Sequence, residues 1–105
     1  MSHRSEARHQ AMTAAASDRL ESLMRESADA LRALPDSATE QLDDDGKKFL
    51  LSVWHDTLPS GDQRVVVQAY QHRILGFGFM HAVGFLVSAN GDKRLLRDEE
   101  LYEFT

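Results

Sequence analysis

The chain has no cysteine, only two prolines and no long apolar run. The absence of cysteine excludes disulfides, thiolate metal sites and a cysteine nucleophile, and it is typical of a reducing compartment. No segment reaches the roughly 20 apolar residues that a membrane-spanning helix needs. The first residues also lack the apolar stretch of a signal peptide. The sequence therefore predicts a cytoplasmic protein with no membrane segment.

Aromatic residues are missing from the first 46 residues, and all of them follow Gly46. The same segment carries five arginines against ten carboxylates, whereas residues 47–105 have seven basic and seven acidic residues. Because aromatic side chains supply the largest buried area per residue, the core must be built around the second half. The first half is expected to cover it. A chain of 105 residues is expected to form a single domain, 1–105.

Residues 18–34 are predicted to form an amphipathic helix. Leucine, methionine and alanine recur at steps of three and four residues between Leu20 and Leu31, which is the spacing of one helical stripe. Pro35 ends this helix, because proline disfavours helical geometry in the residue before it. Residues 1–17 favour helix through their alanines but have little to bury, so we expect a flexible arm there.

Residues 47–97 change to a pattern of β-strands. Four strands are expected where β-branched and aromatic residues lie between turn sequences, at about 48–58, 64–75, 79–89 and 93–96. Asn90-Gly91 is typical of a two-residue type I′ hairpin, and residues 59–62 are typical of a turn. Residues 98–104 are predicted to make a last helical turn. The expected fold is α+β, with an N-terminal helix packed on a four-stranded antiparallel β-meander.

The segment before the sheet is expected to contain no strand. Residues 38–42 follow a helix-capping signature and are predicted to form one short turn. The three aspartates before Gly46 suit calcium only in part. With Gly46 in the sixth position of an EF-hand loop, Ser52 takes the twelfth, where a bidentate acid is needed. We therefore expect a solvated loop and no metal site.

The expected register places apolar residues on both faces of the sheet. If the hairpins close at these turns, Trp54 shares a face with Val65 and Leu96, and Phe49 shares the other with Val66. One helix covers only part of one face, and a larger exposed apolar area usually marks an interaction site. Self-association is therefore expected, with a two-fold dimer favoured. The alternative is a strongly curved sheet whose own helix and C-terminal segment close both faces.

A second hypothesis is a small-ligand pocket between the helix and a curved sheet. An arginine and two histidines flank Gly76-Phe77-Gly78, where these side chains and the glycine amides suit a small anion. Aromatic side chains nearby would complete the lining. The alternative interpretation is a strand end with ordinary polar surface residues that have no binding role. The candidate ligand-binding residues are Trp54, Tyr70, His72, Arg73, Phe79, His81 and Phe85.

The sequence contains no recognisable catalytic motif. His55, Asp56 and Ser52 are the residue types of a hydrolase triad, but adjacent strand residues point to opposite faces. The strand histidines are too far apart for a predicted zinc site, and no cofactor is expected. A net charge of −5 disfavours nucleic acid. The chain is predicted to be a small non-catalytic assembly or interaction protein. The alternative is a ligand-binding protein or an atypical enzyme.

Overall fold

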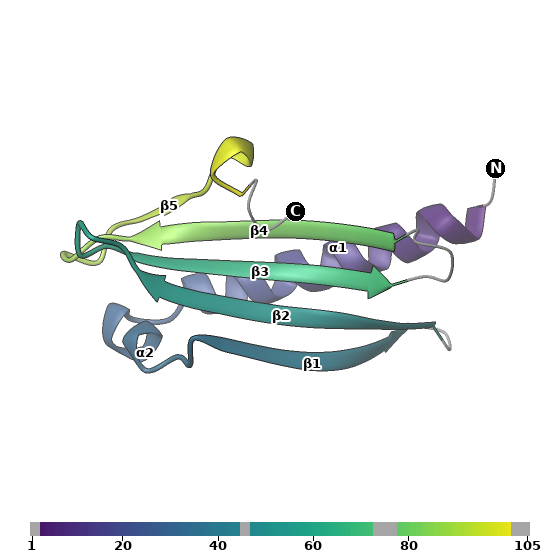
Figure 1. Cartoon of the computed structure of the whole chain (residues 1–105), viewed down its shortest axis with the longest axis horizontal. Helices are drawn as coiled ribbons and strands as arrows, with labels where there is room; N and C mark the ends of the chain where they lie inside the picture. Colours follow the sequence, from purple (N-terminus) through teal and green to yellow (C-terminus); the bar gives the residue numbers. More distant parts are fainter. Residues whose placement is uncertain (1–2, 45–46, 73–77, 102–105) are drawn as a thin grey trace.

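A computed structural model of the chain describes residues 3–44, 47–72 and 78–101. In chain order the elements are α1 (His3–Met24), α2 (Ala28–Arg32), β1 (Ser37–Asp44), β2 (Lys47–Thr57), β3 (Gln63–His72), β4 (Gly78–Val87), β5 (Lys93–Leu95) and the 3-10 turn η2 (Asp98–Glu100). The long helix α1 lies behind the sheet in Figure 1, along β3 and β4. This arrangement confirms the α+β class, with an N-terminal helix packed on an antiparallel sheet and a short C-terminal turn.

Within the described residues the sheet has five strands in the order β1-β2-β3-β4-β5, one more than predicted. The additional strand, β1, replaces the turn and loop expected over this segment. It pairs with β2 from Ser37 opposite Trp54 to Asp44 opposite Lys47. Its side chains are mostly exposed, and Leu42 alone among the described ones is half-buried. Polar residues are tolerated here because an edge strand adds backbone hydrogen bonds without having to fill a core.

The helical part of the chain begins and ends earlier than the predicted helix over 18–34. The alanine-rich segment expected to form an arm belongs to α1, and Met12 and Ala16 are fully buried against the sheet. Small side chains let the helix approach the strands closely. A separate short helix, α2, is capped at its N-terminus by Ser27, whose hydroxyl accepts a hydrogen bond of 3.1 Å from the Ala30 amide.

The β2–β3 and β4–β5 hairpins each close with a three-residue loop. In the β2–β3 hairpin, the Leu58 amide donates to the Asp62 carbonyl (2.8 Å) and the Gly61 amide donates to the Leu58 carbonyl (2.9 Å). Gly61 has φ +92°, and Gly91 takes the same place in the β4–β5 hairpin with φ +93°. This left-handed conformation suits glycine because it has no Cβ. The predicted two-residue closure at Asn90-Gly91 is therefore wrong by one residue.

The longer loops change which side chains share a face, because a slip of one residue turns a strand over. Val53 lies opposite Val67, and Phe85 lies opposite Leu95. The prediction that Trp54 and Leu96 share a face with Val65 is wrong, because Trp54 lies opposite Val66 and Val65 lies opposite His55. Apolar residues still occur on both faces, since Val66 and Leu96 belong to a second apolar cluster. We call the side under α1 the core face. Its buried apolar residues are Phe49, Leu51, Val53, Val65, Val67, Ala69, Phe85 and Val87, packed against Met12, Ala16, Leu20 and Leu31.

Candidate functional site

The face opposite α1, here called the open face, carries a line of large side chains across three strands. Leu50 of β2 lies opposite Tyr70 of β3, which in turn lies opposite Met80 of β4. Leu50 is 38% exposed and Met80 is 37% exposed, while Tyr70 is half-buried. We call these three residues the apolar row. A single exposed apolar side chain is common on protein surfaces. Several next to one another form a contiguous apolar patch, which marks an interaction surface.

The C-terminal segment Leu96–Leu101, here called the strap, covers another part of the open face. Leu96 and Leu101 are nearly buried, and they pack against Val66 and Ala82 in a second apolar cluster. The Leu96 amide donates a hydrogen bond of 2.8 Å to the Gly84 carbonyl, which ties the strap to β4. The chain thus covers part of its own open face, as the curved-sheet alternative expected. The apolar row stays partly exposed.

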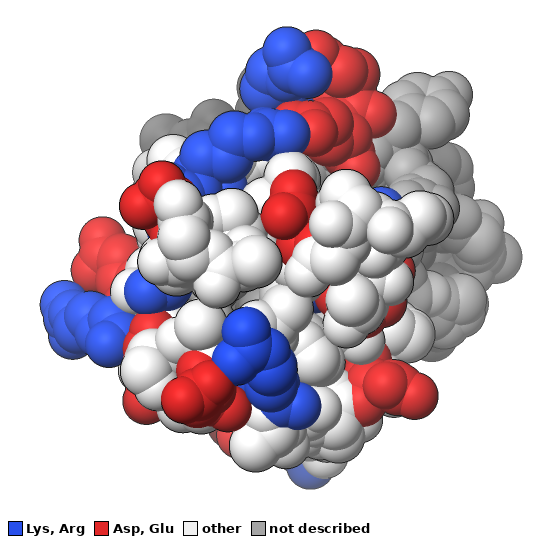
Figure 2. All heavy atoms as spheres, turned by 90° about the vertical axis from the view of Figure 1, so that its left-hand side faces the viewer, with Lys and Arg blue, Asp and Glu red and all other residues white. Residues whose placement is uncertain are grey.

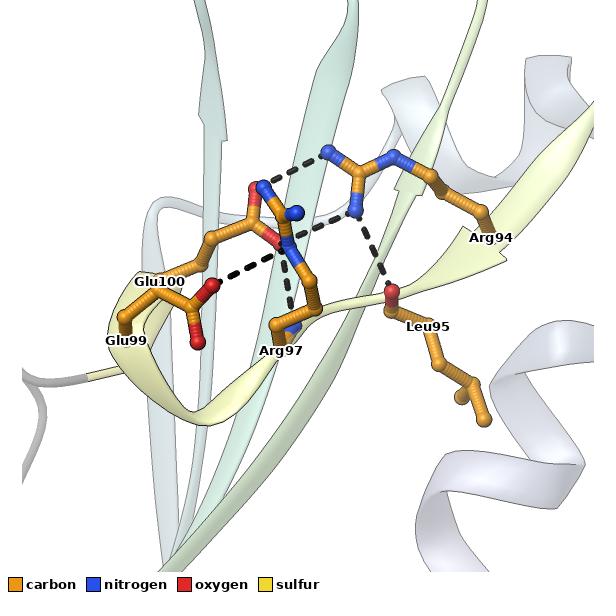
Figure 3. Close-up of polar contacts among 5 residues, drawn as sticks. All are labelled: Arg94, Leu95, Arg97, Glu99 and Glu100. Carbon is orange, nitrogen blue, oxygen red and sulfur yellow. Dashed lines mark hydrogen bonds and ion pairs between the residues drawn. The ribbon is translucent and has the colours of Figure 1, made fainter.

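A charged cluster holds the strap in place (Figure 3). The Arg94 guanidinium donates to both oxygens of the Glu100 carboxylate, at 2.9 and 2.8 Å. The Arg97 amide donates to the same carboxylate at 2.9 Å. The hydrogen bond from Arg94 and then the one from the Arg97 amide hold the pKa of Glu100 well below its usual range. The same carboxylate raises the pKa of Arg94.

The cluster should make stability depend on pH in a defined direction. The pKa of Glu100 is lower in the folded chain than in the unfolded chain. Its ionised carboxylate therefore stabilises the folded state fully above the ordinary glutamate pKa, and this stabilisation is lost as pH falls toward the folded pKa. Glu100→Gln should therefore destabilise the protein at neutral pH, and the gap to wild type should narrow in acid. Urea unfolding of both proteins across this pH range measures the gap. Glu99→Gln, which removes the charge of an exposed carboxylate and keeps its shape, is the matched control. A gap that stays constant with pH would contradict the assignment.

The exposed Trp54 stands apart from the apolar row, in a shallow hollow where β1 begins. The hollow has a volume of about 500 Å³. Trp54 is 40% exposed. The Arg64 guanidinium donates two hydrogen bonds to the Asp56 carboxylate, at 2.9 and 2.5 Å. The His55 amide donates to the Asp36 carbonyl at 3.0 Å, which fixes the chain entering β1. The residues around the hollow are Asp36, Ser37, Trp54, His55, Asp56, Thr57 and Arg64.

The candidate ligand residues are divided between the two faces. Trp54 and Tyr70 lie on the open face. Phe79 and His81 lie on the core side of β4, where the His9 ring stacks on Phe79 with centroids 3.9 Å apart. Phe85 is fully buried on that side and fills the core. The sheet backbone therefore separates the two groups, and they do not line one pocket. The His72 side chain, Arg73 and residues 76–77 lie outside the described residues.

The remaining histidine on β2, His55, has a structural partner. It is 9% exposed, and its Nε2 lies 2.8 Å from Gln63 Oε1. The Gln63 amide group in turn donates to the Ala28 carbonyl at 3.3 Å, so this pair links the sheet to α2. Buried polar groups need such partners because an unmade hydrogen bond is costly. Within the described ranges, no group of three or more histidine, aspartate or glutamate side chains is placed to hold a metal ion.

The charges at the hairpin end of the molecule are mixed. Figure 2 shows lysine and arginine side chains next to aspartate and glutamate over this end, with other residues between them. This end therefore offers no continuous basic surface of the kind that phosphate backbones require. In the described part of the chain, no helix has both the length and the apolar character to cross a membrane.

Comparisons of the chain with protein-family models, with curated proteins and with solved structures find no match.

Proposed function

We propose that this protein is a small, non-catalytic assembly protein of the cytoplasm that forms a two-fold dimer through the open face of its sheet. The observation that supports this is the apolar row, Leu50, Tyr70 and Met80, on the face opposite α1. Removal of apolar surface from water is the main driving force of most protein association. The absence of cysteine fits a reducing compartment.

The surroundings of the apolar row suit an interface. Thr39 Oγ1 and Ser52 Oγ lie 2.8 Å apart, so these hydroxyls bond to each other. The Gln68 side chain donates to the sulfur of Met80 at 3.2 Å. Interfaces commonly have an apolar centre with polar groups around it. In a two-fold dimer the same patch occurs on both copies, so the row of one chain packs against the row of the other.

The free edge of β1 is a poorer surface for self-association. The strand carries Glu40 and Asp43 and has no basic residue of its own. Two copies of β1 paired edge to edge would bring these carboxylates together, and charged side chains are a common device against such pairing. Arg19 of α1 forms an ion pair with Glu40, which holds that side chain toward its own helix. Face-to-face packing keeps the carboxylates of the two copies apart and leaves the ion pair between Arg19 and Glu40 intact.

Met80→Lys should weaken self-association about tenfold or more, because a lysine ammonium would lose water at the centre of the interface. Sedimentation equilibrium of wild type and variant at micromolar concentration measures this change. Leu95→Lys is the matched control, since Leu95 is the most exposed of the large apolar residues described but lies on β5, outside the apolar row. The proposal fails if the wild type is monomeric throughout, or if both substitutions weaken association equally.

A further inference from the structure

The hollow around Trp54 has the size and the wall of a binding site. Its volume of about 500 Å³ lies within the range of roughly 300–1,000 Å³ that ligand sites occupy. Trp54 pairs with Ser37 across β1 and β2, so two strands fix the backbone around the indole. The indole is 40% exposed although the neighbouring Val66 is fully buried. A large aromatic ring left open in a hollow offers its face to a ligand.

The charges of the hollow favour a cation. The Arg64 guanidinium already makes two hydrogen bonds with Asp56, so this pair is largely neutralised internally. Asp36 lines the same hollow, and within residues 3–44, 47–72 and 78–101 no ion pair is formed by its carboxylate. Its backbone is held in place by the His55 amide. Two carboxylates and one guanidinium line the hollow, so their formal charges sum to −1.

We propose that the Trp54 hollow binds a single organic cation of the guanidinium or alkylammonium class. The indole face attracts a cation through its ring quadrupole, and tryptophan does so most strongly among the aromatic residues. The Asp36 carboxylate supplies the opposite charge, and the Ser37 hydroxyl, which shares a face with Trp54, accepts a hydrogen bond from its N–H groups. An anion is disfavoured because Arg64 is engaged and two carboxylates would repel it. This inference is separate from self-association and does not require it.

The experiment uses Trp54 as its own probe, because it is the only tryptophan in the chain. N-acetylarginine amide is added to the full-length protein while tryptophan fluorescence is recorded. N-acetylcitrulline amide, which has nearly the same shape without the charge, is the matched ligand control. The arginine derivative should give a saturable change and the citrulline derivative none. No saturable change with arginine, or an equal change with both, overturns the proposal.

Two variants test the assigned residues. Asp36→Asn should weaken binding of the arginine derivative about fivefold, since it removes the charge and keeps the shape. Glu99→Gln removes a carboxylate on the strap and should leave the dissociation constant unchanged. If Asp36→Asn has no effect, the assignment of the site is wrong. The titration is repeated with Met80→Lys, so that a failure of self-association and a failure of cation binding are seen separately.

The cation has two possible sources, a free metabolite or a side chain of another polypeptide. A heptapeptide with one arginine at the centre of six threonines distinguishes them. Binding of this peptide about tenfold tighter than the capped amino acid assigns the site to a polypeptide, since the flanking backbone then adds contacts. Equal affinity assigns it to a free cation. Both results support the charge recognition, whereas peptide binding that survives replacement of its arginine by citrulline contradicts it.

Discussion

Phe85→Ala should lower the free energy of unfolding by about 3–5 kcal/mol. Phe85 is the largest of the fully buried side chains described. It lies on β4 opposite Val65 of β3 and under α1, so its removal leaves a cavity bounded by helix and sheet. Such a cavity cannot collapse easily because strands on both sides are fixed by hydrogen bonds. Since natural domains are stable by only about 5–15 kcal/mol, this one change should remove a large share of the total.

Urea unfolding of wild type and variant measures this loss, and Trp54→Ala is the informative control. Tryptophan is the larger aromatic residue, but Trp54 is 40% exposed on the open face. Its replacement should cost about 1 kcal/mol or less, as is usual for partly exposed positions. A comparable loss in both variants would mean that the two aromatic residues contribute equally to the core, which contradicts the faces assigned here.

Gly84→Val should be the second strongly destabilising substitution, with a cost of about 1–3 kcal/mol or more from overpacking. A Cβ at Gly84 would lie 2.6 Å from the Val65 carbonyl oxygen and 2.7 Å from Leu96 Cδ1. The first contact is with the backbone of the neighbouring strand, which cannot move without disturbing the β3–β4 pairing. The second is with the strap. Glycine is therefore required here for space.

The position of the strap provides a specific measurement for this variant. The Leu96 amide donates to the Gly84 carbonyl, so its hydrogen exchange should accelerate when valine forces the strap away from β4. Gly91→Ala is the matched control. A Cβ at Gly91 meets nothing within 4 Å, so the cost there is only that of a φ of +93°. This should be about 1 kcal/mol, with Leu96 exchange little changed. Equal exchange rates in the two variants would show that the strap does not depend on Gly84.

The class of fold and four of the strands could be predicted from the sequence because their signals are local. Runs of β-branched and aromatic residues located β2 to β5 to within a few residues. The register was lost because Gly61 and Gly91 close three-residue loops, and one extra residue turns over β2 and β5. The apolar pattern could not correct this error, because the predicted register also placed apolar residues on both faces.

The first strand could not be predicted from its own residues. The segment Ser37–Asp44 has no alternation of apolar and polar side chains, since both its faces are largely exposed. What holds it is pairing with β2, a property of the assembled sheet. The alanine-rich start of α1 was predicted to be a flexible arm for a similar reason, because its order depends on contacts with the assembled sheet. Apart from Met12 this segment has mainly small alanine side chains, yet Met12 and Ala16 are both fully buried in the folded chain.

The candidate site was predicted only in part. Trp54 and Tyr70 do lie on an exposed surface, as a binding role requires. Phe85 was misplaced because the wrong register put it beside Trp54, although burial of its ring was foreseeable from its apolar neighbours. The hollow depends on Asp36, a residue that follows a proline and carries no motif. Only the path of the chain between α2 and β1 brings Asp36 to the hollow that Trp54 lines.

The meander order of the sheet has a kinetic consequence. Each strand pairs with its neighbour in sequence, so the sheet can grow by successive short closures, each of which orders few residues. The distant contacts are those of α1, which must reach β3 and β4 across the intervening chain. Local pairing of this kind favours rapid folding for a chain rich in β-structure. The slowest step of folding should be the packing of α1 against β3 and β4, which follow it in the sequence.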